Sequence, residues 1–177
     1  MNNMSQNQPK RAISIVTSDT VNIPQPGAYL TGSSSTNGTT LRDTTKNFRD
    51  GDSTIGQNNK VAVGDVVIVP IGAGGNPEMA QVIGLAGSNR LTFASPGILV
   101  SSPYDYKIYR GNGGVVNTTQ GLDGYSLFVG GAGDVSVVTV DGDEIVMKNV
   151  GNASFIPQQV IRVKAAGTTA SDIIALD

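Results

Sequence analysis

The sequence contains neither cysteine nor histidine. Without cysteine there can be no disulfides, thiolate metal sites or cysteine nucleophiles, and the redox compartment is left undetermined. Without histidine, the chain lacks Ser-His-Asp catalysis, the commonest zinc ligand and the side chain most often used for proton transfer near neutral pH. Any hydrolase chemistry would therefore have to use carboxylates or lysine.

Charge and long apolar runs are also scarce. Charged residues make up 15% of the chain, the net charge is −2 and the sequence pI is near 5.0. Because nucleic-acid binding rests on a basic field, we expect no nucleic-acid partner. No apolar run approaches the roughly 20 residues that cross a bilayer, and the start MNNMSQNQPKR lacks the apolar stretch of a secretory signal. We expect a soluble protein, made inside a cell, with no membrane partner.

What the chain does contain favours short strands joined by tight turns. It has 23 glycines and 8 prolines among 177 residues, a length between one and two domains. Alternating or β-branched segments predict strands. These segments are 12–16, 61–71, 78–85, 90–95, 104–110, 127–130, 134–140, 144–150, 155–165 and 172–177.

Three of these predictions concern particular residues. Asp141-Gly142 predicts a hairpin with a type I′ turn, which needs positive φ at both central residues. In the segment IRVK, Ile161 and Val163 are expected to face inward while Arg162 and Lys164 face water. The C-terminal DIIALD is predicted to be an interior strand, because Ile173, Ile174 and Leu176 crowd the chain end.

The segments between the strands suggest how the domains are organised. Residues 1–10 are polar and are predicted to form a flexible arm that orders only against a partner. Two stretches are typical of turns or linkers, SDTVNIPQPG at 18–27 and GNGGVVNTTQGLDG at 111–124. LTGSSSTNGTTL at 30–41 and FRDGDSTIGQNNK at 48–60 are predicted to be polar loops.

Three glycine-rich segments resemble ligand loops but depart from the known patterns. GGAGD at 130–134 resembles a calcium-binding repeat, yet it occurs once and its Asp directly follows the third Gly. DGDSTIGQNNK at 50–60 resembles an EF-hand loop, but Val61 stands where a bidentate Glu is needed. GAGGNP at 72–77 follows a strand, but Pro77 occupies the third glycine position of a dinucleotide fingerprint. We interpret all three as turns or loops.

Two further groups could carry a function. Asp141, Asp143 and Glu144 are a conceivable acid and base pair for a glycan hydrolase or lyase, although acids that flank a turn are usually solvated. Tyr104, Tyr106 and Tyr109 could line a carbohydrate surface, although half-buried aromatics are ordinary in strands. We therefore assign no catalytic, cofactor-binding or metal-binding residue.

A family resemblance rests on two separated pieces. Residues 125–177, which include VGGAGDVSVVT and VKAAGTTASDIIAL, resemble the spike base protein family of tailed phages and gene transfer agents, and RAISIVTSDTVNIP at 11–24 resembles that family's first segment. The two pieces lie close together in compact members of that family. The resemblance therefore implies that residues 11–27 and 120–177 form one domain, interrupted by an inserted domain at 28–119, since loops tolerate insertions.

The expected fold is all-β: a small antiparallel β-sandwich or jelly-roll-like domain interrupted by a small β-barrel. The insert loosely resembles β modules of phage structural proteins, through VGDVVIV, AQVIGL, RLTF and YDYKIY.

The resemblance implies a virion structural role without catalytic activity, on the capsid surface of a particle assembled in the host cytoplasm. The implied partners are the major capsid protein or another virion protein, further copies of the chain as a homo-oligomer, and a fibre protein. A host-glycan-binding module of a fibre or baseplate is one alternative, and a carboxylate-dependent glycan hydrolase is another.

Overall fold

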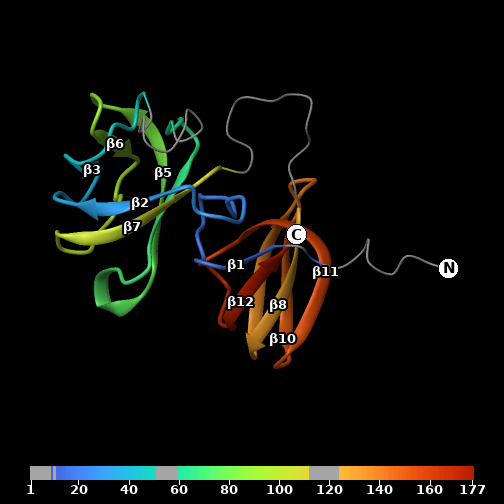
Figure 1. Ribbon diagram of the computed structural model, residues 1–177. Coiled ribbons are helices and arrows are strands. Elements are labelled where there is room, and N and C mark those ends of the chain that lie inside the picture. Colours follow the sequence, from blue (N-terminus) through green and yellow to red (C-terminus); the bar gives the residue numbers. More distant parts are fainter. Residues whose placement is uncertain (1–8, 10, 51–59, 112–123) are drawn as a thin grey trace. The chain divides into compact units, whose positions relative to one another are not determined.

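The protein is all-β, as predicted. The computed structural model describes residues 9, 11–50, 60–111 and 124–177, so the arm predicted at 1–10 lies, apart from Pro9, outside the described residues. The chain divides into two compact units, one of residues 1–27 with 122–177 and the other of residues 28–121. We call these the divided unit and the inserted unit. In Figure 1 the first blue strand lies with the orange and red strands, and the second blue strand lies with the cyan to yellow strands.

The divided unit contains one antiparallel sheet of six strands. They are β1 (Ala12–Ser14), β8 (Tyr125–Gly131), β9 (Gly133–Thr139), β10 (Glu144–Val150), β11 (Ser154–Val163) and β12 (Ser171–Leu176). Their order across the sheet is β1-β12-β8-β11-β9-β10. DIIALD is therefore an interior strand, as predicted, because β12 lies between β1 and β8.

Strand β11 joins the two layers of a sandwich. Its first half pairs with β8, where Ile156 lies opposite Leu127. Its second half pairs with β9, where Val163 lies opposite Val137, and irregularities in both ladders fall between residues 156 and 162. Such irregularities bend a strand and increase its twist, so one long strand can pass from one layer to the other.

The inner face of the divided unit is a continuous apolar row. Ile13, Ala175, Leu127 and Ile156 lie side by side on β1, β12, β8 and β11, and all four are buried. Directly opposed residues of an antiparallel pair share a face. The prediction for IRVK also holds for the apolar pair, since Ile161 and Val163 are buried.

Residues 18–27, predicted to be a turn or linker, are attached to the sandwich along their length. The amide of Ser18 donates to the carbonyl of Val163 at 2.9 Å, and the amide of Ile23 donates to that of Ile161 at 2.8 Å. Val21 and Ile23 are buried. The prolines and Gly27 indicated a turn, but two apolar side chains and the free edge of β11 hold the segment against the sandwich.

The hairpin at Asp141-Gly142 exists, but its turn type was predicted wrongly. Strands β9 and β10 are antiparallel, with Glu144 opposite Val138. The amide of Gly142 donates to the carbonyl of Thr139 at 3.0 Å. Gly142 has a positive φ of 91° and Asp141 does not, so the turn is not type I′.

The inserted unit is a nearly closed barrel. Its strands are β2 (Leu30–Ser34), β3 (Thr40–Arg42), β4 (Val66–Val69), β5 (Glu78–Leu85), β6 (Arg90–Phe93) and β7 (Tyr104–Tyr109), in the order β2-β7-β4-β5-β6-β3. The two end strands meet where the amide of Ser35 donates to the carbonyl of Arg42 at 2.8 Å. The short 3₁₀ helix η3 (Ala73–Gly75) lies between β4 and β5.

Strands β2 and β3 lie within the segment predicted to be a polar loop. Apolar residues are sparse there, but Leu30 and Leu41 are buried in the barrel core. Position 32 requires glycine, because a Cβ there would collide with the carboxylate of Asp43 and the hydroxyl of Tyr106. Pairing of β2 with β7 and of β3 with β6 therefore overrides the local polar composition.

Candidate functional site

The GGAGD segment is the connection between β8 and β9: its first two residues end β8, its last two begin β9, and Ala132 alone lies between them. A Cβ at Gly133 would clash with the backbone of Ala170, and one at Gly130 would press on Asp172. Asp134 accepts hydrogen bonds from Lys148 Nζ at 2.7 Å and from the amide of Asn149 at 3.0 Å. The hydrogen bond from Lys148 holds the pKa of Asp134 below its usual value. The glycines therefore admit a close backbone approach, and the acid is held by groups of its own chain.

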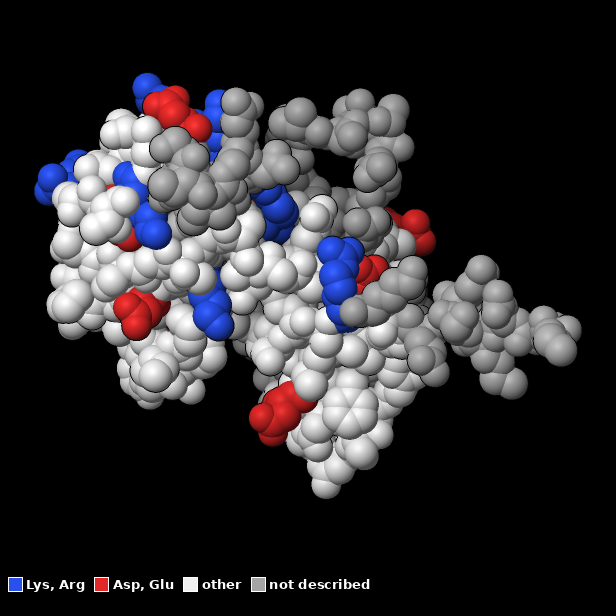
Figure 2. Space-filling model, in the orientation of Figure 1, with Lys and Arg blue, Asp and Glu red and all other residues white. Residues whose placement is uncertain are grey.

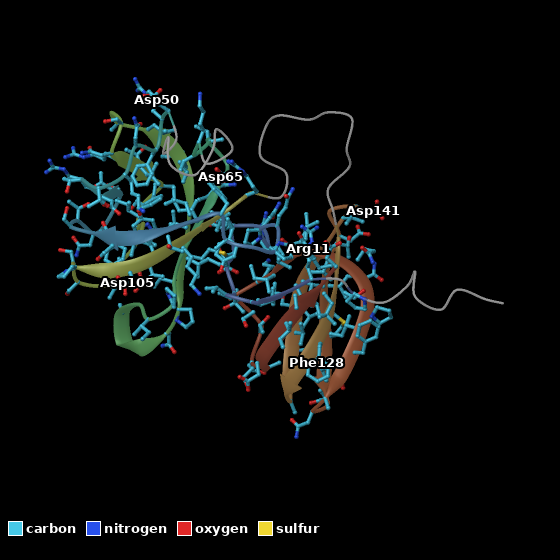
Figure 3. All side chains as sticks on the ribbon, viewed as in Figure 1. Arg11, Asp50, Asp65, Asp105, Phe128 and Asp141 are labelled. Carbon is cyan, nitrogen blue, oxygen red and sulfur yellow. The ribbon has the colours of Figure 1, made fainter. Side chains whose placement is uncertain are left out.

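The three acidic residues around the turn between β9 and β10 are exposed and do not form a cleft. Asp141, Asp143 and Glu144 are all exposed, and Glu144 accepts a hydrogen bond from Lys164 Nζ at 2.7 Å. Figure 3 places Asp141 on a turn of the divided unit. Within the described ranges, no three acidic side chains gather as metal ligands would.

The loop at 72–77 is filled by a carboxylate of the protein itself. Glu78 accepts hydrogen bonds from the amides of Ala73, Leu99 and Val100. Backbone amides that cradle a phosphate must point into an open concavity, whereas the amide of Ala73 is already occupied. The other candidate loop, at 50–60, falls mostly outside the described residues, since only its ends Asp50 and Lys60 are described.

Two of the three tyrosines cannot line a carbohydrate surface. Tyr104 is 5% exposed and Tyr106 is 1% exposed, and both belong to the barrel core. The carbohydrate alternative is therefore excluded for these two residues, because the face of β7 that carries them meets the barrel core. Tyr109, at the end of the strand, is half-buried.

Tyr106 instead belongs to a buried polar cluster that the sequence did not reveal. Its hydroxyl donates to Asp43 at 2.8 Å, and Thr45 donates to the same carboxylate from its amide at 2.9 Å and its hydroxyl at 2.6 Å. Burial acts to raise the pKa of Asp43, but these hydrogen bonds outweigh it and the pKa is lowered. Burial, together with the neighbouring carboxylate, raises the pKa of Tyr106.

A second buried cluster joins the two ends of the inserted unit. Asp65, 4% exposed, accepts from the Tyr29 hydroxyl at 2.5 Å, the Ala62 amide at 2.9 Å, Arg110 Nη1 at 2.9 Å and the Gly111 amide at 3.3 Å. The Arg110 guanidinium also lies 3.9 Å from the centre of the Tyr29 ring. Burial is the main cause that raises the pKa of Tyr29.

Asp65 therefore fastens together the strand that enters the barrel and the strand that leaves it (Figure 3). The amide of Tyr29 also donates to the carbonyl of Ile108 at 3.0 Å. Both polar clusters are satisfied by groups of the protein, so their chemistry is structural. The nearest sequence signals were an isolated Gly-Asp pair before β4 and an Arg after β7, which do not predict the contact.

The exposed groups of greatest interest lie on the outer face of the divided unit. Ile174, Phe128 and Phe155 lie side by side on β12, β8 and β11, in the row next to the buried inner one. Phe155 is 56% exposed, while Ile174 and Phe128 are half-buried. We call these three residues the outer row. A group of large apolar side chains on a sheet surface is typical of an interaction site.

Charge does not gather into one field on the view shown. On the face shown in Figure 2, the described basic and acidic side chains are interspersed. Within the described ranges, no helix has the length and apolar character needed to cross a membrane.

No family model, curated protein or solved structure matches this chain.

Proposed function

We propose that the chain is a non-enzymatic structural protein of a phage particle, where the divided unit attaches to the major capsid protein or another virion protein. Further copies of the chain and a fibre protein are its other proposed partners, and the capsid surface is its proposed location. The observation that carries the proposal is the exposed outer row of Ile174, Phe128 and Phe155.

The arrangement of the chain supports this role. The pieces that resemble the spike base family, 11–24 and 125–177, belong to one compact unit although a whole barrel separates them in sequence. Asp65 fastens the segment that enters the barrel to the segment that leaves it. A self-contained module carried on an attachment domain suits a protein that displays one part of itself while another part is bound.

The outer row fits a protein partner better than a small ligand. It runs across three neighbouring strands, so it presents an extended surface rather than a pocket. Aromatic residues are enriched in the cores of protein interfaces and carry much of their binding energy. Phe155 is the most exposed of the three, so a partner would bury most surface at this residue.

The test is attachment of the full-length chain to particles. A tagged chain, expressed in cells that assemble particles without their own copy, is expected to purify with the particles and to appear on their surface by electron microscopy. Phe155→Lys should lower the number of copies per particle about tenfold, which corresponds to the loss of one hot-spot contact.

Val63→Lys is the matched control, since Val63 is 54% exposed on the inserted unit. It should leave the occupancy unchanged, and circular dichroism should show both variants folded. A tagged chain that never purifies with particles would overturn the virion assignment. Equal occupancy of the parent and Phe155→Lys would overturn the assignment of the outer row.

A further inference from the structure

The open edge of β10 is a second surface that could bind a partner. Strand β10 is the last strand of its sheet, and among the described strands only β9 pairs with it. Both of its faces are exposed, with Ile145 40% and Val146 48% exposed. An open edge presents unpaired backbone groups, and proteins usually guard it with a proline, a bulge or a charge that faces inward. From Glu144 to Met147 the ladder with β9 is regular, and the irregularity comes only after Met147.

Alternate residues of β10 point their backbone amide and carbonyl groups away from β9, toward the open side. The amide of Thr139 donates to the carbonyl of Asp143 at 3.0 Å, which makes Thr139 and Asp143 a hydrogen-bonded pair. Backbone groups of successive residues alternate in direction along an antiparallel strand. Asp143, Ile145 and Met147 therefore direct theirs to β9. Glu144 and Val146 direct theirs to the open side.

The sequence of this strand is complementary to itself. If two copies pair antiparallel with Val146 opposite Val146, then Ile145 lies opposite Met147 and Glu144 lies opposite Lys148. The outward sets of the two strands meet each other in this register. Opposite charges that face each other across strands stabilise a pair, and like charges destabilise it.

The neighbouring registers are worse. Centring the pair on Ile145 sets Asp143 opposite Met147. Centring it on Met147 sets Lys148 opposite Val146 and includes Asn149, whose φ of 53° interrupts the strand. Registers shifted by a single residue would set residues whose backbone groups point outward opposite residues whose groups point to β9, so the two strands could not form a hydrogen-bonded ladder. Of these registers, the one centred on Val146 pairs opposite charges and keeps Asn149 out of the paired segment.

Existing ion pairs fit the same arrangement. Lys148 Nζ lies 2.7 Å from Asp134, and Lys164 Nζ lies 2.7 Å from Glu144. In the paired strands the Glu144 carboxylate of the second copy joins Lys148. The charges across the joined sheets then alternate in sign, as Asp134, Lys148, Glu144 of the second copy and Lys164 of the second copy.

We propose that β10 pairs with β10 of a second copy of this chain, about a two-fold axis normal to the sheet at Val146. The two sheets become one continuous sheet. The partner is the chain itself, because the edge matches its own sequence in both charge and apolar contacts. This proposal does not rest on the virion assignment, since it concerns the purified protein alone.

The first test uses the absence of cysteine from the chain. Hydrogen-bonded antiparallel pairs have Cα atoms about 5.5 Å apart, within the range that a disulfide spans. The full-length Val146→Cys variant should therefore form a covalent dimer under mild oxidation, at low micromolar concentration. Ile83→Cys is the control, since Ile83 is 53% exposed on a strand of the inserted unit.

The second test weakens the contact. Val146→Lys sets two ammonium groups opposite each other at the axis, so it should raise the dimer dissociation constant measured by analytical ultracentrifugation about tenfold or more. Ile83→Lys should leave it unchanged. The proposal is overturned if Val146→Cys cross-links no faster than Ile83→Cys, or if the parent protein is monomeric at millimolar concentration. A dimer that Val146→Lys leaves as tight as the parent's would overturn it as well.

Discussion

The carboxylate of Asp65 holds the two ends of the barrel, so its removal should destabilise the inserted unit selectively. Asp65→Ala removes the acceptor of four hydrogen bonds. A hydrogen bond to a charged group contributes about 1.5–3 kcal/mol, but Arg110 is 36% exposed and can turn to water. Counting the bonds from Tyr29 and Ala62 in full and the others at a small fraction, we expect a loss of about 3–6 kcal/mol.

Asp65→Asn keeps the shape and part of the hydrogen bonding, so its expected cost is about 1–2 kcal/mol. Native-state hydrogen exchange with mass spectrometry on the full chain is the appropriate assay, because the two units need not unfold together. Peptides from β4 and β7 should lose protection, while peptides from β8 and β12 serve as an internal reference.

Asp105→Ala is the matched control, since Asp105 is an exposed acid on β7 (Figure 3). It should change protection by less than about 0.5 kcal/mol. If β4 and β7 exchange in Asp65→Ala as they do in the parent, the four contacts do not stabilise the barrel. Equal loss in both units would refute the idea that the cluster acts within the inserted unit.

Three further predictions follow from burial and connectivity. Burial raises the pKa of Tyr29 and Tyr106 above 10.0. As the pH rises, the unfolded state therefore loses these protons first, and the free energy of unfolding should fall above about pH 10 by up to about 1.4 kcal/mol per pH unit for each tyrosine. Tyr106→Phe should make that decline shallower in urea titrations, and an unchanged slope would contradict the assignment. Deleting residues 171–177 removes an interior strand with buried Ile173 and Ala175, so circular dichroism should show the divided unit unfolded or the protein insoluble; a truncated protein that melts like its parent would disprove this. Replacing residues 28–119 with a short Gly/Ser linker should leave a folded β protein, and an unfolded product would show that the divided unit needs the barrel.

The strands with strong alternation or dense β-branching were predictable. The segments 78–85 and 144–150 coincide with β5 and β10, and the other predicted segments overlap β1, β4, β6 to β9, β11 and β12. On β7 the period of two reflects one buried and one exposed face, whereas β4, buried at every position, and β10, mostly exposed, were predictable from their β-branched residues. β2 and β3 were missed because each contributes mainly backbone pairing and a single buried apolar side chain.

The polar contacts could not be predicted, since they depend on the assembled barrel. Asp65 meets Tyr29 and Arg110 across 36 and 45 residues of sequence. The inward direction of Tyr104 and Tyr106 depended on which face of β7 met the core, and alternation alone allows either face. The outer row emerged only when the registers of β12, β8 and β11 were known.

The pairing of Arg11 with Asp177 in the divided unit also bears on how the protein can be re-engineered. The amide of Asp177 donates to the carbonyl of Arg11 at 3.0 Å, and the amide of Arg11 donates back at 3.3 Å. If residues 1–10 are removed, these two residues are close enough to be joined by a short linker, as circular permutation requires. Reopening the joined chain in a loop of the barrel would move both termini to the inserted unit and would turn that unit into an attachment point for a fused cargo, with every strand of the sandwich continuous.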